Sequence, residues 1–148
     1  MRFSLKVRYA IYGVFDLAYN AGAQPVQSRV VSQRQGIPVR YLEQIFQLLR
    51  RAGLLTSKRG PGGGYALAVA AEDILLRDIV EAVEGPIDLA PEAEAETQRA
   101  PHRPDFLWPV LNARLSSTLA EMTLAEVCRE AQRIALPRQD PDAPMYFI

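Results

Sequence analysis

The sequence predicts a mainly α-helical protein with one small β-hairpin. Several segments repeat apolar residues every three or four positions, which is the spacing of one helix face. Between the third and fourth of these segments, two β-prone stretches flank the glycine-rich run RGPGGGY at residues 59–65. With 148 residues, 49% of them hydrophobic, the chain is long enough for one compact core with an appendage.

Two helices are predicted before residue 36. From Ser4 to Asn20, apolar residues recur on one helix face, and Ala21-Gly22 ends the segment. The stretch from Val26 to Gln35 is shorter and more mixed, with Ser28 as a candidate N-cap. Gly36 then ends this helix and permits a tight turn.

A third helix is predicted from Val39 to Arg51. Pro38 suits the first helical position, and an apolar stripe runs from there to Ala52-Gly53. Two short helices joined by a glycine-containing turn, packed on a longer helix, form a helix-turn-helix. In that motif the last helix is offered to the major groove of DNA.

The glycine-rich run predicts the tip of a hairpin, a wing beside the helix-turn-helix. Leu54–Ser57 and Tyr65–Ala68 have the composition of its two strands. A nucleotide-binding loop is excluded, because no Gly-Lys-Ser/Thr sequence follows Gly60 and no βαβ pattern surrounds the run. A flexible hairpin tip without a binding role remains an alternative.

The second half of the chain predicts three further helices and a loop. Glu72–Val83 has helical spacing and closes at Gly85-Pro86, whereas Ile87–Asp105 is rich in proline and acidic residues and predicts a loop. A long helix is predicted from Phe106, with an apolar stripe at near-heptad spacing. The stripe comprises Leu107, Val110, Leu111, Leu115, Leu119 and Met122.

That stripe predicts a homodimer through the helix that starts near Phe106, although packing onto its own domain is the alternative. Thr123 and Glu126 form a capping box that opens a last helix, with Leu124, Val127, Cys128, Ala131 and Ile134 along one side. The predicted organisation is a winged helix-turn-helix domain (1–86), an effector-type loop (87–105), a dimerisation helix with a terminal helix (106–136) and a tail (137–148).

Charge is divided unequally between the two halves of a chain whose formal net charge is zero. Residues 1–60 hold ten Lys or Arg against Asp16 and Glu43, about +8, and residues 61–148 carry the compensating excess of acid. A basic half is the footprint of a phosphate-binding surface, and an acidic remainder keeps the rest of the protein off nucleic acid. The pattern favours double-stranded promoter DNA as the partner.

The third helix supplies the side chains that could read bases. Gln44 matches an adenine edge, Arg40 guanine or phosphate, and Tyr41 phosphate or a thymine methyl group, while Glu43 could accept from cytosine. In the wing, Arg59 could enter a narrow minor groove and Lys58 could bind phosphate. The predicted DNA-contacting set is Ser28, Arg40, Tyr41, Glu43, Gln44, Arg51, Lys58, Arg59, Gly60, Gly62 and Gly63.

Other classes of function are disfavoured by what the sequence lacks. No apolar run approaches the roughly 20 residues of a membrane span, and Met1–Lys6 has no signal-peptide pattern, so we expect a cytoplasmic protein. The lone His102 has no catalytic motif beside it, which argues against an enzyme. Cys128 is the single cysteine and predicts a buried apolar residue rather than a redox sensor. No cofactor is predicted.

Several motifs spread over most of the chain belong together: Met1-Arg2-Phe3-Ser4 with Arg8-Tyr9-Ala10, Tyr41-Leu42-Glu43-Gln44, Arg51-Ala52-Gly53-Leu54, RGPGGGY at 59–65, Asp78-Ile79-Val80 with Val83-Glu84-Gly85-Pro86, and Met122-Thr123-Leu124. With them the chain resembles the IscR-like, or Rrf-two type, iron–sulfur cluster regulators, which are winged-helix repressors and activators. The resemblance implies a homodimer on promoter DNA, base contacts from Tyr41 and Gln44, modulation of specificity by Glu43, and minor-groove insertion by Arg59.

The chain departs from this family in the loop after the fourth helix. Members that sense iron, nitric oxide or redox state hold a cluster there with three cysteines, whereas Leu89–Asp105 contains none and carries Glu92, Glu94, Glu96 and His102 instead. We therefore expect no cluster of the usual kind. The chain also departs at position 40, where it has Arg40 and smaller polar residues are commoner in the family.

The signal that this chain senses is left open by its sequence. A small molecule, a metal in the acidic loop, a partner protein and oxidation of Cys128 all remain candidate effectors. So does the choice between repression and activation. The competing reading is a winged-helix protein-interaction module without DNA affinity, against which the charge division argues.

Overall fold

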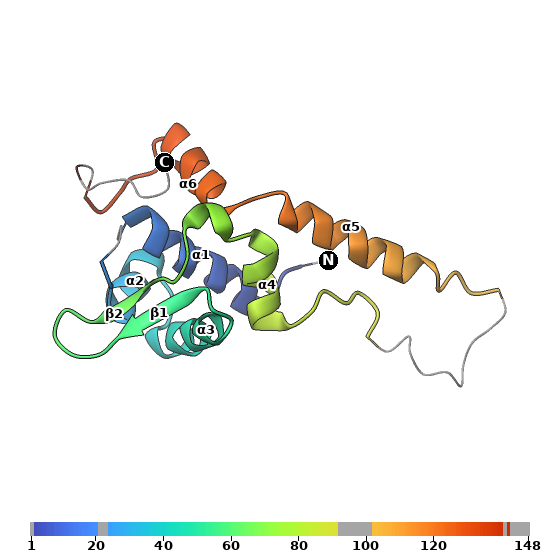
Figure 1. Cartoon of the computed structure of the whole chain (residues 1–148), viewed down its shortest axis with the longest axis horizontal. Coiled ribbons are helices and arrows are strands. Elements are labelled where there is room, and N and C mark those ends of the chain that lie inside the picture. Colours follow the sequence, from blue (N-terminus) through green and yellow to red (C-terminus); the bar gives the residue numbers. More distant parts are fainter. Residues whose placement is uncertain (1, 21–23, 92–101, 141, 143–148) are drawn as a thin grey trace.

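The computed structural model describes residues 2–20, 24–91, 102–140 and 142. Figure 1 shows a body of helices with a hairpin at one side and a long helix projecting from the other. The elements are α1 (Leu5–Asn20), α2 (Ser28–Gln35), α3 (Val39–Arg51), β1 (Leu55–Lys58), β2 (Gly64–Leu67), the short 3₁₀ helix η1 (Ala71–Asp73), α4 (Leu76–Glu84), α5 (Leu107–Ala120) and α6 (Leu124–Arg133). The predicted fold class, mainly α with a small hairpin, is confirmed.

Helix α1 is the central element, contacting α2, α3, α4, α6 and β2. Its apolar face, including Val14 and Leu17, is buried in the core. Gly13 brings α1 unusually close to α3, since a Cβ at this position would lie 2.6 Å from the Phe46 ring. This close packing therefore fixes the distance between α3 and α1.

A buried carboxylate joins α1 to α2. Asp16 has no solvent exposure, and its Oδ2 accepts a hydrogen bond from the Arg34 guanidinium at 2.5 Å. Its Oδ1 accepts from Arg34 Nε at 3.1 Å, Gln35 Nε2 at 2.8 Å and Asn20 Nδ2 at 3.1 Å. The four bonds compensate the charge for its lost hydration, and the three from Arg34 and Gln35 pin the carboxyl end of α2 onto α1.

The turn between α2 and α3 is built as expected around Gly36, which takes a left-handed conformation with φ 66°. Ser32 Oγ donates to the Ile37 carbonyl at 2.5 Å and closes the turn. Two boundary details of the sequence prediction are wrong. Ser28 is the first helical residue rather than the N-cap, because Gln27 continues the extended backbone of Val26. Pro38 is the N-cap of α3, with Val39 the first helical residue.

The wing is an antiparallel hairpin in which Leu55 pairs with Leu67 and Lys58 with Gly64. Both strands lie one residue away from their predicted bounds. The reason is an additional bridge, in which Val26 and Tyr65 exchange two backbone hydrogen bonds of 2.8 Å. The segment before α2 therefore adds a single bridge to the two-stranded sheet, next to the start of its second strand.

Helices α4 and α6 begin beside each other. Leu75 and Thr123, the N-caps of the two helices, form an isolated antiparallel bridge. The predicted capping box of Thr123 with Glu126 is confirmed. The predicted helix over 72–83 is wrong at its start, since η1 and an extended Ile74 precede α4 and make room for the bridge.

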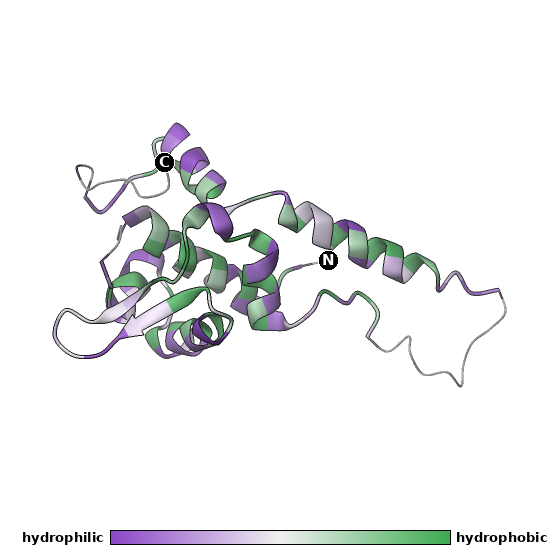
Figure 2. Ribbon diagram, in the orientation of Figure 1, coloured by the Kyte–Doolittle hydropathy of each residue, from purple (hydrophilic) through white to green (hydrophobic). Residues whose placement is uncertain are grey.

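Helix α5 is exposed along much of its length, and no α5 residue is fully buried. Its carboxyl-terminal half contacts α4, and Leu119 packs against the core. At its other end Phe106 is 75% exposed and Val110 45% exposed. Figure 2 shows hydrophobic residues along this projecting helix. The apolar stripe is thus divided between its own domain and solvent.

Two predicted features cannot be compared directly. Residues 92–101 of the acidic loop and residues 143–148 of the tail lie outside the described residues. On the described side of the loop, the Leu89 N–H donates to Asn112 Oδ1 of α5 at 2.9 Å. None of the described helices is long and apolar enough to cross a membrane.

Removing the Asp16 carboxylate should strongly destabilise the protein. Asp16→Ala leaves the Arg34 guanidinium, only 15% exposed, without its counter-charge, and breaking a buried pair costs about 3–5 kcal/mol. Urea unfolding followed by circular dichroism measures the loss. Glu130→Ala, which breaks the exposed pair with Arg133, is the control and should leave the unfolding free energy nearly unchanged. Equal effects of the two substitutions would contradict this role for Asp16.

Candidate nucleic-acid interface

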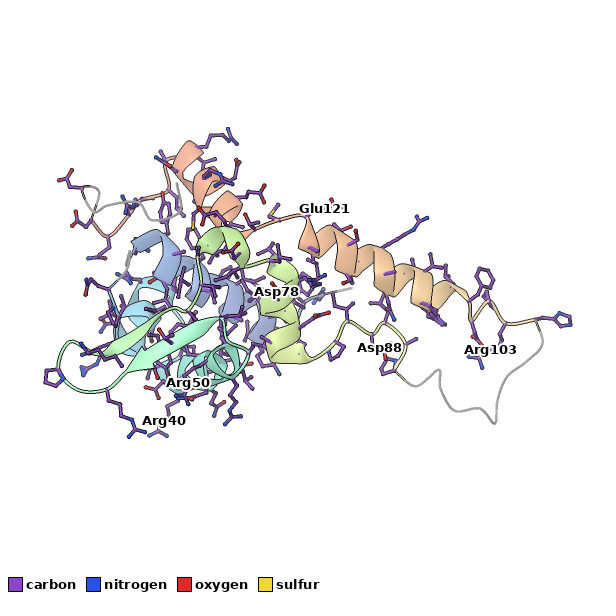
Figure 3. The ribbon with its side chains drawn as sticks, in the orientation of Figure 1. Arg40, Arg50, Asp78, Asp88, Arg103 and Glu121 are labelled. Atoms are coloured by element: carbon purple, nitrogen blue, oxygen red, sulfur yellow. The ribbon has the colours of Figure 1, made fainter. Side chains whose placement is uncertain are left out.

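Helix α3 presents a polar face on the side opposite its buried stripe. Arg40, Glu43, Gln44 and Arg51 are exposed on this helix, while Leu42, Ile45, Phe46 and Leu49 are buried beneath it. Figure 3 shows Arg40 pointing outward from the body, below α3 and the wing. The spacing of helical residues therefore places a guanidinium and a carboxamide, Arg40 and Gln44, one turn apart on the outer face.

Tyr41 differs from its exposed neighbours because its ring is half-buried. It packs edge-on against Tyr9 of α1, with ring centroids 5.7 Å apart and planes at 75°. The contact fixes the direction in which the side chain leaves α3.

Ser28 and Glu43 tie the two helices of the motif together at their exposed edge. Ser28 Oγ, at the amino end of α2, donates to Glu43 Oε1 at 3.0 Å. The bond holds the carboxylate toward α2 rather than leaving it to sample solvent freely. Glu43 is thereby pre-positioned on the outer face of α3.

The wing is held against α3 by side chains from both elements. Tyr65 of β2 packs edge-on against Phe46 at 4.9 Å, and its hydroxyl accepts from Gln47 Nε2 at 3.0 Å. Nearer the end of α3, Arg50 Nη1 donates to Ser57 Oγ of β1 at 3.4 Å. Helix and wing thus form one continuous surface with a fixed relative orientation.

The glycines of the wing have distinct structural roles. Gly60 and Gly62 take positive φ values of 85° and 70° and face open space. Gly63 is buried, and a Cβ there would overlap the carbonyl oxygens of Lys58 and Gly60. The backbone can therefore approach another surface at Gly60 and Gly62, whereas Gly63 closes the loop. Lys58 and Arg59 are exposed.

A hollow of about 340 Å³ lies between the amino end of α2 and the wing. Five of the residues predicted from sequence line it, Ser28, Glu43, Lys58, Gly60 and Gly63, and Arg29 adds a further cation. Sequence reasoning missed Arg29, although a basic residue in the first turn of the first motif helix was a usable signal. Backbone N–H groups and cations together at a helix amino end favour an anionic ligand such as phosphate.

The predicted contact residues therefore fall into two groups. One comprises Arg40, Tyr41, Gln44 and Arg51 on α3, and the other comprises Ser28, Glu43 and the wing residues, of which Lys58, Gly60 and Gly63 line the hollow together with Ser28 and Glu43. Within the described residues, every one of the predicted contact positions belongs to α2, α3 or the hairpin.

Cys128 and His102, the two residues weighed for redox or metal chemistry, lie away from this surface. Cys128 is fully buried on α6, and burial raises the pKa of its thiol to about 12. His102 is exposed beyond the far end of α5. Among the described residues, no three His, Cys, Asp or Glu side chains gather closely enough to hold a metal ion.

The chain is similar in sequence to known regulators. The profile of the Rrf2 family, described as an iron-dependent transcriptional regulator, matches residues 3–130. An HTH-type transcriptional regulator IscR from Vibrio atlanticus is 37% identical over 148 residues, covering 96% of this chain and 84% of that protein. The IscR of Photobacterium profundum is 39% identical over 132 residues, covering 88% of this chain and 77% of the relative.

Solved structures give the same result. IscR of T. potens superimposes with a TM-score of 0.73 at 30% identity and covers 93% of each chain. CymR, the global cysteine regulator of B. subtilis, gives a TM-score of 0.72 at 31% identity, covering 88% of this chain and 98% of the other. The similarity thus extends over the body and the projecting helix.

Alanine at positions 62 and 63 should affect the wing differently. Gly62→Ala should cost only about 1–2 kcal/mol, the strain of a Cβ on a left-handed backbone, because the open space around it leaves the added methyl group no atom to clash with. Gly63→Ala must displace two carbonyls and should loosen the hairpin as far as Tyr65. Hydrogen exchange of the Tyr65 amide, bonded to Val26, is the measurement. Faster exchange in both variants alike would contradict the distinction.

The Cys128 thiol should be inert in the folded protein. A pKa of about 12, against an ordinary value near 9, keeps it protonated, so at pH 8 a thiol-specific disulfide reagent should react only after unfolding in urea. Because the folded pKa is raised, the stability gained by burying the neutral thiol is complete below pH 9 and is lost as pH rises toward 12. Rapid reaction of the native thiol at pH 8 would refute its burial.

Proposed function

The chain belongs to the Rrf2 family of transcriptional regulators. We propose that it acts as a cluster-free homodimer that reads promoter DNA with α3 and contacts the adjoining sugar–phosphate backbone with the wing. The observation that carries this proposal is the joint surface of α3 and the hairpin. Arg40, Gln44, Arg51, Lys58 and Arg59 are exposed on it, and the Gln47–Tyr65 hydrogen bond joins its two elements. Among the described residues, no arrangement of side chains supports an enzymatic activity to a comparable degree.

Base recognition is assigned to the outer face of α3. Gln44 would pair with an adenine edge in the major groove and Arg40 with guanine or a phosphate, each good contact being worth about 1–3 kcal/mol of discrimination. Tyr41, anchored on Tyr9, would touch the flanking backbone or a thymine methyl group. Glu43, held by Ser28, would admit cytosine and repel a misplaced phosphate.

The wing and the amino end of α2 would bind the sugar–phosphate backbone. Glycines at positions 60 and 62 let the wing approach closely, and Arg59 would enter a minor groove whose narrowness concentrates negative potential. Arg29, Ser28 and Lys58 surround the hollow in which a phosphate would lie. Arg51, at the end of α3, would reach the same strand of backbone.

Dimerisation is assigned to the free end of α5. Phe106, Leu107 and Val110 are 75%, 38% and 45% exposed, and a second copy of the helix would cover them. Paired reading heads would then bind a roughly palindromic site with half-sites about one helical turn, or a multiple, apart.

An iron–sulfur cluster does not fit the donors of this chain. Clusters are ligated chiefly by cysteine thiolates, and the sequence contains one cysteine, which is buried and held protonated. The description of the family as iron-dependent therefore does not extend to a cysteine-ligated cluster here. The signal would reach the regulator by another route.

Binding of the purified protein to genomic DNA fragments at two salt concentrations tests the proposed function. Sequence-specific retention that weakens steeply with salt is expected, because released counterions make phosphate contacts salt-dependent. Binding that shows neither sequence preference nor salt dependence would refute it.

Arg59→Ala should weaken DNA binding without disturbing dimerisation. Loss of one cationic contact should reduce the slope of log affinity against log salt by about one unit. Titration of labelled duplex at several salt concentrations gives the slope, and analytical ultracentrifugation gives the oligomeric state. Arg133→Ala, an exposed arginine on α6, is the matched control and should bind as the unmodified protein does. An unchanged slope for Arg59→Ala would exclude its role.

A charge on the free end of α5 should separate the protomers. Val110→Glu places a carboxylate in the proposed dimer contact, where burial of an unpaired charge is strongly unfavourable. Sedimentation velocity should show monomers for this variant and dimers for Gln132→Glu, which adds the same charge to the exposed surface of α6. Dimers in both samples would place the interface elsewhere.

A further inference from the structure

The chain after α6 turns back sharply and lies beside the carboxyl end of α1 (Figure 1). The turn is made by Ala135, which has a positive φ of 54° although it is not glycine. The Leu136 and Ala135 N–H groups donate to the carbonyls of Ala131 and Gln132, closing α6. We call residues 134–140 the C-terminal strap.

Three residues of the strap, Leu136, Arg138 and Gln139, fasten it to the last turn of α1. Tyr19 donates its hydroxyl to the Leu136 carbonyl at 2.8 Å, and Arg138 Nε donates to the Tyr19 carbonyl at 3.1 Å. The Arg138 guanidinium also lies over the Tyr19 ring, 5.7 Å from its centroid. A cation that binds a terminal carbonyl stabilises the negative end of the helix dipole.

The third fastening continues into the core. The Gln139 N–H donates to Asn20 Oδ1 at 2.8 Å, and Asn20 Nδ2 donates in turn to Asp16 Oδ1 at 3.1 Å. Asp16 is the carboxylate that holds Arg34 and Gln35 at the carboxyl end of α2. Asn20 and Asp16 therefore link Gln139 of the strap to Arg34 and Gln35 of α2, the first helix of the helix-turn-helix.

From this connection we infer that the C-terminal strap positions the helix-turn-helix for DNA reading, through Asn20 and Asp16. Asn20 acts as the positioning residue, because its amide binds the strap on one side and orients the Asp16 carboxylate on the other. Ser28 of α2 in turn holds the Glu43 carboxylate in position on α3. The inference rests on the proposed DNA-reading function of α3 and the wing.

Two substitutions at Ala135 provide a matched pair. Proline cannot adopt a φ of 54° and would redirect the strap, whereas glycine adopts it without strain. The readout is the ratio of affinity for a selected specific duplex to affinity for an unrelated duplex. A partly unfolded sample lowers both affinities equally and leaves this ratio unchanged, so the ratio reports positioning rather than folding.

Ala135→Pro is expected to lower the specific-to-unrelated ratio by about 2- to 30-fold, the usual size of coupling through a packed network. Ala135→Gly should keep the ratio of the unmodified protein. Asn20→Ala, which breaks the relay but leaves the strap turn intact, should lower the ratio as Ala135→Pro does. This second variant decides the question if the proline variant fails to fold.

An unchanged ratio in Asn20→Ala would overturn the inference, as would an equal fall for Ala135→Gly and Ala135→Pro. Neither result touches the proposed function, since specific binding by the unmodified protein would remain. If the unmodified protein itself prefers no duplex over another, it is the proposed function that fails.

Discussion

The arrangement of the reading surface depends on one buried carboxylate. Among the described residues, Asp16 is the charged side chain that solvent does not reach, and a buried charge is tolerated only when its hydrogen-bonding capacity is filled. Arg34 and Gln35 fill it from α2, so α2 cannot slide along α1 without stranding the charge. The placement of α2 then determines two further contacts, Ser28 with Glu43 and Val26 with Tyr65. Through these, the ion pair contributes to the placement of both Glu43 on α3 and the wing.

Local patterns in the sequence predicted most of this fold. The bounds of α3 agree with the prediction, because a strong apolar stripe is bounded by Pro38 on one side and Gly53 on the other. What was missed depends on contacts between distant residues. The strands moved by one position because Val26 pairs with Tyr65, 39 positions away along the chain, and the Asp16 network has no local signature because its α2 partners lie 18 and 19 residues away. Similarly, the division of the α5 stripe depends on where α4 lies.

The candidate site shows the same contrast between composition and geometry. Glutamine, arginine and glycine at suggestive positions predict that α3 and the wing face DNA. Their fixed orientations come from neighbours that periodicity does not reveal, such as Tyr9 behind Tyr41 and Gln47 beneath the Tyr65 hydroxyl. The family match covers the helix-turn-helix and the wing, whereas the sequence has a single cysteine and therefore not the donors of a cysteine-ligated cluster.

The central claim is that α3 and the wing read DNA sequence, and selection from a pool of random duplexes tests it most directly. After several rounds of retention by the purified protein, the recovered duplexes should share an inverted repeat whose half-sites lie about one helical turn, or a multiple, apart. The same selection with Gln44→Ala should relax one position in each half-site. Recovered duplexes with no common sequence, or an identical motif for both proteins, would contradict the account.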